Sequence, residues 1–155
     1  MESLAGAVME LPVRVALSAS GVFLLVGLLT GVWKYAGMAR SSDAQAHPYV
    51  DIAHRASLLY SFAALVMAAL AAVSAWPMVV DLHAVVWPLL FFALAIGTYV
   101  VHGWLGDTDN QLRAPHRLGT RRLPGAIVHG FMLLLVVAEV GGVAVLVAGA
   151  WCTLW

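Results

Sequence analysis

Charged side chains are scarce in this chain. Asp, Glu, Lys and Arg together make up 10% of its 155 residues, whereas 63% of the residues are hydrophobic. In soluble domains roughly a quarter of the residues are charged, so this composition cannot cover a water-soluble globule. It predicts a single integral membrane domain over residues 1–155, with the lipid bilayer as its surroundings. The formal net charge is zero, which gives no reason to expect a nucleic-acid partner.

Cysteine is almost absent as well. The one cysteine, Cys152, excludes an intrachain disulfide and any cysteine-based zinc or iron–sulfur site. The sequence has no P-loop, no Gly-x-Ser-x-Gly and no His-Glu-x-x-His motif. A di-iron site of the helical-bundle type uses several glutamates, but Glu139 is the only one expected inside the membrane. Residues 1–10 are acidic rather than basic, so we expect no cleavable signal peptide.

Four apolar stretches are long enough to cross a bilayer as helices. A span needs about 20 apolar residues, and the stretches cover residues 15–36, 54–78, 82–105 and 123–150. The predicted fold class is therefore all-α, a four-helix transmembrane bundle. Pro77 and Pro88 are predicted to bracket a tight turn between the second and third spans, and Pro124 suits the first turn of the fourth.

Lysine and arginine set the expected orientation of the bundle. Seven of the eight lie in or beside the two long loops, which join the first span to the second and the third to the fourth, and only Arg14 lies on the other side. Cytoplasmic loops carry an excess of these residues, so both chain termini are expected outside the cytoplasm. The expected location is the inner (cell) membrane of a bacterium.

Small residues mark where helices are expected to meet. Gly27 and Gly31 form a GxxxG pair in the first span, and Ala138 and Gly142 form a similar pair in the fourth. Small residues let helix backbones approach closely in lipid. The pairs therefore indicate close packing within the bundle or between copies of the chain.

Three histidines from different spans are expected at a similar depth. His54 begins the second span, His102 closes the third, and His129 lies about one turn into the fourth. Neutral imidazole is a common metal ligand and an axial ligand of haem, so the three predict an intramembrane haem or metal site. The alternative interpretation is that they are polar groups at the water boundary.

His54 is the strongest single candidate for a metal ligand. Asp51, Ser57 and Ser61 lie three before, three after and seven after it, so all four share one helical face. A carboxylate or hydroxyl there could orient the imidazole toward a metal. Asp51 and Ser57 could equally be ordinary helix-start groups.

Two tyrosines and one glutamate add polar groups within the spans. Tyr99 precedes His102 by three residues and shares its face, and Tyr60 lies in the second span. Either hydroxyl could donate to a bound oxygen atom or serve packing alone. Glu139 lies ten residues after His129, about 15 Å along a helix, so the two cannot share one metal ion. Glu139 could belong to a proton path or bond a neighbouring helix.

Two segments resemble the membrane styrene oxide isomerases. AHRASLLYSF places Ala53 and His54 on the family's Ala-His pair, and DNQLRAPHRLGTRRLPG carries Asn110 and a Gly/Pro-containing approach to the last helix. The chain differs at Tyr60, where the family has asparagine, and Tyr99 is not an unambiguous match to its third-helix tyrosine. The resemblance implies a four-helix fold, haem b with His54 as axial ligand, ferric iron acting as a Lewis acid, and a trimer with haem near the subunit contacts.

Three functions remain open at this point. The first is a haem-dependent isomerase that converts a small apolar epoxide to a carbonyl compound, with His54 on the metal and Tyr60 or Tyr99 orienting the substrate. The second is a b-type cytochrome that carries electrons. In it, His54 together with His102 or His129 would occupy both axial positions of the haem iron. The third is a non-catalytic accessory subunit of a membrane complex. The residues expected to bind the cofactor are His54, His102, His129 and Asn110.

Overall fold

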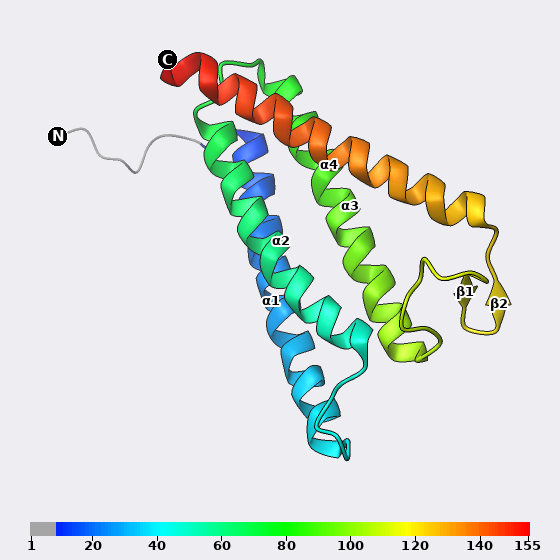
Figure 1. Cartoon of the computed structure of the whole chain (residues 1–155). Coiled ribbons are helices and arrows are strands. Elements are labelled where there is room, and N and C mark those ends of the chain that lie inside the picture. Colours follow the sequence, from blue (N-terminus) through cyan, green and yellow to red (C-terminus); the bar gives the residue numbers. More distant parts are fainter. Residues whose placement is uncertain (1–8) are drawn as a thin grey trace.

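The computed structural model describes residues 9–155, which form four long helices and one small hairpin (Figure 1). The helices are α1 (Leu11–Arg40), α2 (Pro48–Ala72), α3 (Met78–Leu105) and α4 (Gly125–Leu154). By length and composition all four can cross a membrane. The all-α, four-helix prediction is therefore confirmed for the described part of the chain. The expectation about a signal peptide, and the start of the predicted domain, fall partly on residues 1–8, outside that part.

The hairpin lies in the α3–α4 loop and was not predicted. Strand β1 (Arg117–Leu118) pairs antiparallel with β2 (Arg121–Arg122), and Gly119 between them has a φ of 59°. A left-handed conformation of this kind favours glycine, because glycine has no side chain to clash with the backbone.

Helices α2 and α3 extend beyond the starts of the spans predicted from residues 54 and 82. Helix α2 begins at Pro48, where His47 caps it by accepting a hydrogen bond from the Tyr49 N–H at 3.3 Å. Pro77 is the N-cap of α3, whereas Pro88 lies inside that helix, so the prediction that both prolines bracket a turn is wrong for Pro88. The Pro88 ring packs closely on Gly142 of α4, a contact of the kind that accommodates proline in membrane helices.

Helices α1 and α2 form an intimate antiparallel pair. Ser20 and Ser61 each donate a side-chain hydrogen bond to the other's carbonyl at 2.9 Å. A Cβ added to Gly27 would lie 2.6 Å from the side chain of Leu58, and one added to Gly31 would lie 2.9 Å from the ring of His54. Both glycines predicted to allow close packing therefore do so, against α2.

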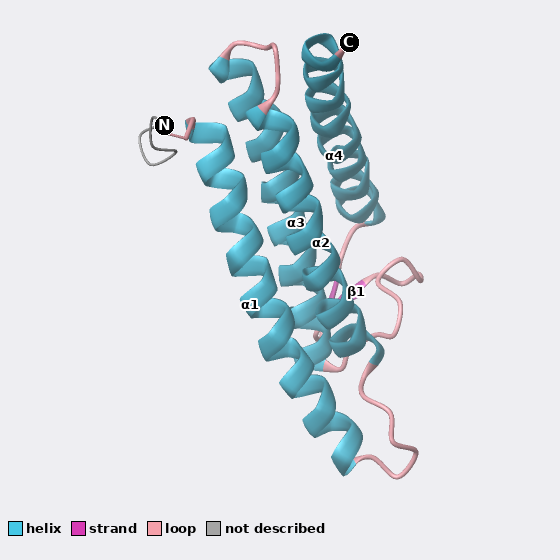
Figure 2. Cartoon of the chain, turned by 90° about the vertical axis from the view of Figure 1, so that its left-hand side faces the viewer, coloured by secondary structure: helices cyan, strands magenta, loops and turns pink. Residues whose placement is uncertain are grey.

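Helix α4 diverges from the other three along its length (Figures 1 and 2). Its later part packs on the bundle, where Trp76 Nε1–H donates to the Val145 carbonyl at 2.9 Å and Ala75 N–H donates to the Gly149 carbonyl at 3.0 Å. Only 6% of the residues in its most apolar 18-residue stretch are buried, against 39% for α3. Helix α4 is thus held mainly near one end.

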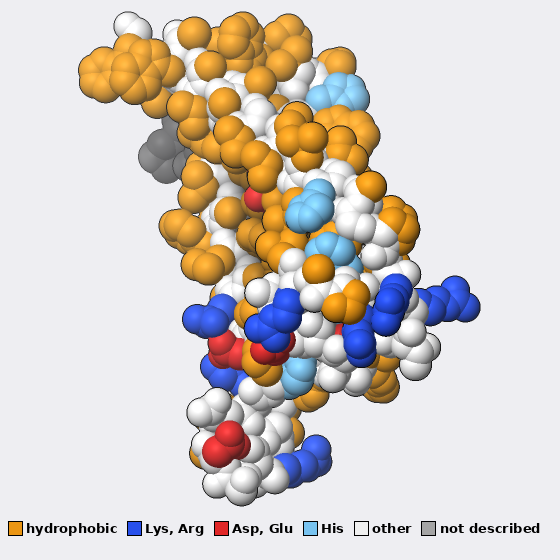
Figure 3. All heavy atoms as spheres, turned by 45° about the vertical axis from the view of Figure 1, so that its right-hand side comes forward, with side chains coloured by type: hydrophobic (Ala, Val, Ile, Leu, Met, Phe, Trp, Pro, Cys, Tyr) orange, Lys and Arg blue, Asp and Glu red, His pale blue; other side chains and the backbone are white. Residues whose placement is uncertain are grey.

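Basic side chains gather at one end of the molecule (Figure 3). We call the end formed by the loops 41–47 and 106–124 the basic end. There Asp51 of α2 pairs with Lys34 of α1 at 2.5 Å and with Arg55 at 2.6 Å. Trp33 and Trp104 pack together with ring centroids 6.5 Å apart. The loops that carry most of the lysines and arginines therefore lie at the same end of the fold, as the sequence predicted.

Candidate functional site

His54 lies in the contact between α2 and α1. Its Nδ1 is 2.8 Å from the carbonyl oxygen of Gly27, and its half-buried ring packs where Gly31 leaves room. A carbonyl can only accept, so Nδ1 carries the hydrogen and donates it. The lone pair then resides on Nε2, which has no hydrogen-bond partner among residues 9–155. This is the tautomer that a second-shell carbonyl commonly imposes on a metal-binding histidine.

The polar residues predicted to share the face of His54 do share it. Asp51 reaches Lys34 of α1, and Ser61 reaches Ser20 of α1. Neither of them orients the imidazole, however, and Ser57 donates back to the Ala53 carbonyl of its own helix at 2.7 Å. The orienting group is a backbone carbonyl, which no side-chain pattern in the sequence reveals.

His102 is held in a buried hydrogen-bond network at the basic end. Its Nδ1 lies 2.8 Å from Oδ1 of Asp107, and both side chains are 6% exposed. The second oxygen of Asp107 accepts from the Gly119 N–H at 2.5 Å. Gly106, with a φ of 58°, turns the chain left-handed at the end of α3 and brings Asp107 back toward His102. The ring of Tyr49 packs against the imidazole, with centroids 5.1 Å apart.

The electrostatics of Asp107 follow from this network. Burial opposes ionisation, but the hydrogen bonds from His102 and from the Gly119 N–H outweigh it and hold the pKa of Asp107 below its ordinary value. The carboxylate is therefore ionised at neutral pH and can only accept hydrogen bonds. In consequence Nδ1 of His102 is the donor, and Nε2 is the nitrogen left for other partners.

His129 lies in a third environment. It is exposed near the start of α4, and its ring meets that of His116 edge to face with centroids 5.5 Å apart. His54, His102 and His129 thus have separate sets of partners. Within residues 9–155 no group of three or more His, Cys, Asp or Glu side chains is placed to hold a metal ion. The expectation that the three imidazoles meet at one site is not met there.

Tyr60, Tyr99 and Glu139 come from three helices. Tyr60 of α2 stacks on Phe92 of α3 with centroids 4.0 Å apart, and Tyr99 of α3 stacks on Tyr49 of α2 with centroids 6.0 Å apart. Oε1 of Glu139 in α4 is buried and has no hydrogen-bond partner in the described part of the chain. The predicted roles of both tyrosines at a bound substrate stay predictions.

Asn110 shapes the loop between α3 and α4. Its side-chain oxygen accepts from the Leu112 N–H at 2.9 Å, and its own N–H donates to the Thr108 hydroxyl at 3.1 Å. The residue is exposed. Its observed contacts are those of a turn, and its predicted role at a cofactor stays a prediction.

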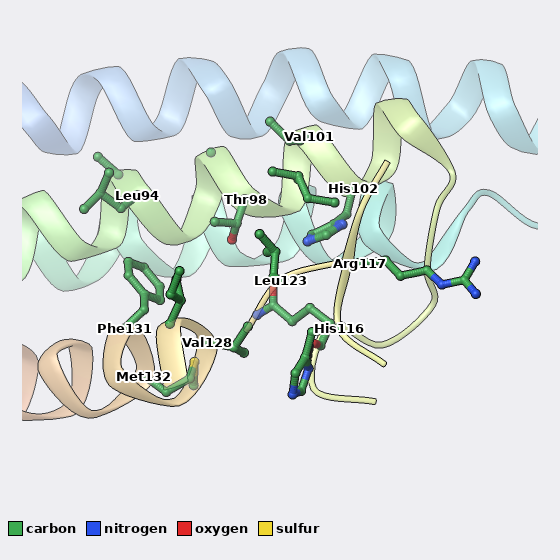
Figure 4. Close-up of a pocket in the computed structure, with 15 residues that line it drawn as sticks. Leu94, Thr98, Val101, His102, His116, Arg117, Leu123, Val128, Phe131 and Met132 are labelled. Carbon is green, nitrogen blue, oxygen red and sulfur yellow. Dashed lines mark hydrogen bonds between the residues drawn. The ribbon is translucent and has the colours of Figure 1, made fainter. Parts of the chain in front are cut away.

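A cavity of about 480 Å³ lies between α3, the following loop and α4 (Figure 4). Apolar side chains line most of it, among them Leu94, Val101, Val128 and Phe131. His102 and His116 line its loop end. No residue of α1 or α2 lines it.

Sequence reasoning missed this cavity and the partners of His102. The signal for Asp107 was present, since an Asp follows His102 by five residues across a glycine that can turn the chain back. Tyr49 and Gly119 could not be found this way, because they reach the same site from other parts of the chain.

Comparison with protein-family models, curated proteins and solved structures gave no match.

Proposed function

We propose that this chain is an integral membrane protein that binds haem b through Nε2 of His54 and isomerises small apolar epoxides to carbonyl compounds. The observation that carries the proposal is the fixed tautomer of His54, whose Nδ1 is 2.8 Å from the Gly27 carbonyl. The resemblance of AHRASLLYSF to the styrene oxide isomerases supports the same residue.

The surroundings of His54 fit the role of an axial ligand. The hydrogen bond to Gly27 raises the basicity of the imidazole and fixes the direction of its ring. Gly31 leaves the ring room to lie against α1, because a Cβ there would come within 2.9 Å of Cε1 and 3.0 Å of Nδ1 but 3.7 Å of Nε2. Of these three ring atoms, Nε2 is the one farthest from Gly31.

Ferric haem held there would supply a Lewis acid, which draws electron density from a bound epoxide oxygen. The chain's own part is to hold one nitrogen in place in the contact between α1 and α2. The isomerisation moves atoms within one molecule, so it consumes neither water nor electrons. Tyr60 stacks on Phe92 and Tyr99 stacks on Tyr49, and in this proposal either hydroxyl would orient the substrate.

The proposal extends to assembly and topology. A homo-oligomer, with the trimer implied by the resemblance, would cover part of α4, which is largely exposed in the single chain. Both termini lie outside the cytoplasm of a bacterial cell in this proposal, supported by the basic side chains around the opposite loops.

The first experiment is an absorption spectrum of the protein purified in detergent from haem-replete cells. A Soret band that disappears in His54→Ala but persists in His83→Ala is expected, since His83 is exposed on α3 away from the α1–α2 contact. Haem bound normally by the His54 variant would exclude this ligand.

The same spectrum separates the three functions. A five-coordinate ferric spectrum that changes when an epoxide analogue is added supports the isomerase. A six-coordinate, low-spin spectrum supports the electron carrier, although the structure gives His102 and His129 other partners. Absence of a Soret band would leave the accessory subunit as the remaining hypothesis.

A further inference from the structure

The cavity between α3 and α4 results from how the two helices cross. Near one end Gly142 lets α4 approach the Pro88 ring, and a Cβ at that glycine would lie 2.5 Å from Cγ of the proline. Farther toward the basic end the rings of Phe91 and Phe131 stand between the helices, with centroids 5.7 Å apart. Small residues at one end and aromatic residues farther along accompany the divergence of the two helices (Figure 1), and the cavity lies where they are apart.

The shape and lining of the cavity fit a small molecule with an apolar body. Its volume of about 480 Å³ lies within the range of about 300–1,000 Å³ found for small-molecule sites. Its walls are mainly apolar, and its polar lining residues are Thr98 on α3 together with His102, Gln111, His116 and Arg117 at the loop end. A ligand there would place its apolar part between the helices and a polar group near the loop.

The polar end offers a hydrogen-bond acceptor. His102 is 5% exposed and lines the cavity, and its Nδ1 is committed to Asp107. Its Nε2 has no hydrogen-bond partner within residues 9–155, so in the neutral imidazole this nitrogen can accept one. His116 repeats the arrangement, because its Nδ1 lies 3.0 Å from the Gln111 carbonyl.

We propose that this cavity binds an apolar molecule carrying a hydroxyl group, of the phenol, naphthol or quinol class, whose hydroxyl donates a hydrogen bond to Nε2 of His102. A carboxylate fits less well, since it has no hydrogen to donate to this nitrogen and Asp107 already carries negative charge beside it. Figure 4 shows the guanidinium of Arg117 turned away from the cavity, so it does not supply a cation inside. The site is separate from His54 and does not depend on haem.

The test measures binding of 2-naphthol, naphthalene and 2-naphthoate to the purified full chain in nanodiscs, with empty nanodiscs subtracted for partition into lipid. We expect 2-naphthol to bind about two- to tenfold more tightly than naphthalene, the range for one net hydrogen bond. His102→Phe removes the acceptor and also the donor to Asp107, so naphthalene affinity in this variant reports any effect of loop opening on the cavity. The ratio of 2-naphthol to naphthalene affinity should fall to about one.

Gly97→Phe provides a second variant that leaves the His102–Asp107 pair intact. Gly97 lines the cavity and a Cβ there meets nothing within 4 Å, so the added side chain starts from open space and is directed to fill the cavity. It should remove binding of both 2-naphthol and naphthalene. Gly21→Phe is the matched control, because Gly21 is equally unobstructed but lies on α1 and does not line the cavity.

Several results would overturn the proposal. Equal affinity for 2-naphthol and naphthalene would identify a site for lipid acyl chains, and tighter binding of 2-naphthoate would identify an anion site. Binding that survives Gly97→Phe would place the ligand elsewhere. His54→Ala should bind 2-naphthol normally, so failure of haem binding and failure of this site are distinguishable.

Discussion

The hydrogen bonds of Asp107 should hold the α3–α4 loop in its closed conformation. Its carboxylate accepts one hydrogen bond from His102 at 2.8 Å and one from the Gly119 N–H at 2.5 Å. In Asp107→Asn only one side-chain oxygen remains as an acceptor, and the amide NH₂ must face the other donor. A hydrogen bond to a charged group contributes about 1.5–3 kcal/mol, so losing one should cost about 2 kcal/mol of loop closure.

The rate of trypsin cleavage measures how often the α3–α4 loop opens. The loop carries Arg113, Arg117, Arg121 and Arg122, all exposed, and cleavage tracks the open population when opening is fast. A cost of about 2 kcal/mol corresponds to roughly thirtyfold more open loop, so Asp107→Asn should be cleaved roughly thirtyfold faster than the parent chain.

The matched control is Asp109→Asn in the same loop. Asp109 pairs with Arg113 at 2.9 Å, but their side chains are 56% and 66% exposed. Exposed ion pairs contribute about 0–1 kcal/mol, so cleavage should rise by no more than about fivefold. If both variants were cleaved at the same rate, the buried network around Asp107 would not be what closes the loop.

The same carboxylate predicts how loop closure depends on pH. Because hydrogen bonds hold the folded pKa of Asp107 below its ordinary value despite burial, its stabilising effect is fully present above the unfolded value of about 3.9. It is lost as pH falls through the lower, folded pKa. Pepsin, which works in acid, measures this loss when its rate on the loop of the parent chain is divided by its rate on the isolated loop peptide at the same pH. That ratio should rise as the pH falls in the parent chain and stay constant in Asp107→Asn. A similar rise in the variant would argue against the assignment.

The remaining predictions use pairs of glycines. Gly31→Ala should lower haem retention by displacing the ring of His54. Gly21→Ala on the same helix should not, because a Cβ there meets no atom within 4 Å. Equal Soret absorbance in the two variants would contradict the proposed packing. Gly142→Val should destabilise the bundle by about 1–3 kcal/mol through overpacking against α3, while Gly141→Val, beside it and unobstructed, should have little effect. Thermal unfolding followed by tryptophan fluorescence measures this difference, and equal melting temperatures would show that α4 does not pack as described.

Much of the α1–α2 contact was predictable from residue spacing. A helical face is a local property, so the sequence alone placed Asp51, His54 and Ser61 together. Their partners were not predictable, because the carbonyl of Gly27 and the side chain of Lys34 belong to another helix whose register is set by packing. The depth of His102 was expected, but its burial depends on Asp107 and Tyr49, which a chain reversal and a second helix bring to it.

Pro88 shows a limit of local rules. Proline ends or kinks helices in general, and the sequence favoured a turn there. The structure keeps Pro88 inside α3, where it packs on Gly142 from a segment more than fifty residues later. Tertiary contact therefore overrode the local preference.

The sequence by itself determined that four helices are long and apolar enough to cross a bilayer, and that basic side chains collect at one end. These follow from composition along the chain, because a segment in lipid must satisfy its backbone hydrogen bonds internally and a helix does so without partners. Only the tertiary structure decided which faces meet, that Nε2 of His54 and Nε2 of His102 have no hydrogen-bond partner among residues 9–155, and that α4 diverges beside a cavity. Those features depend on contacts between residues far apart in the chain, and lipid favours no particular pairing of apolar helices, so side-chain shape and hydrogen bonds choose among them.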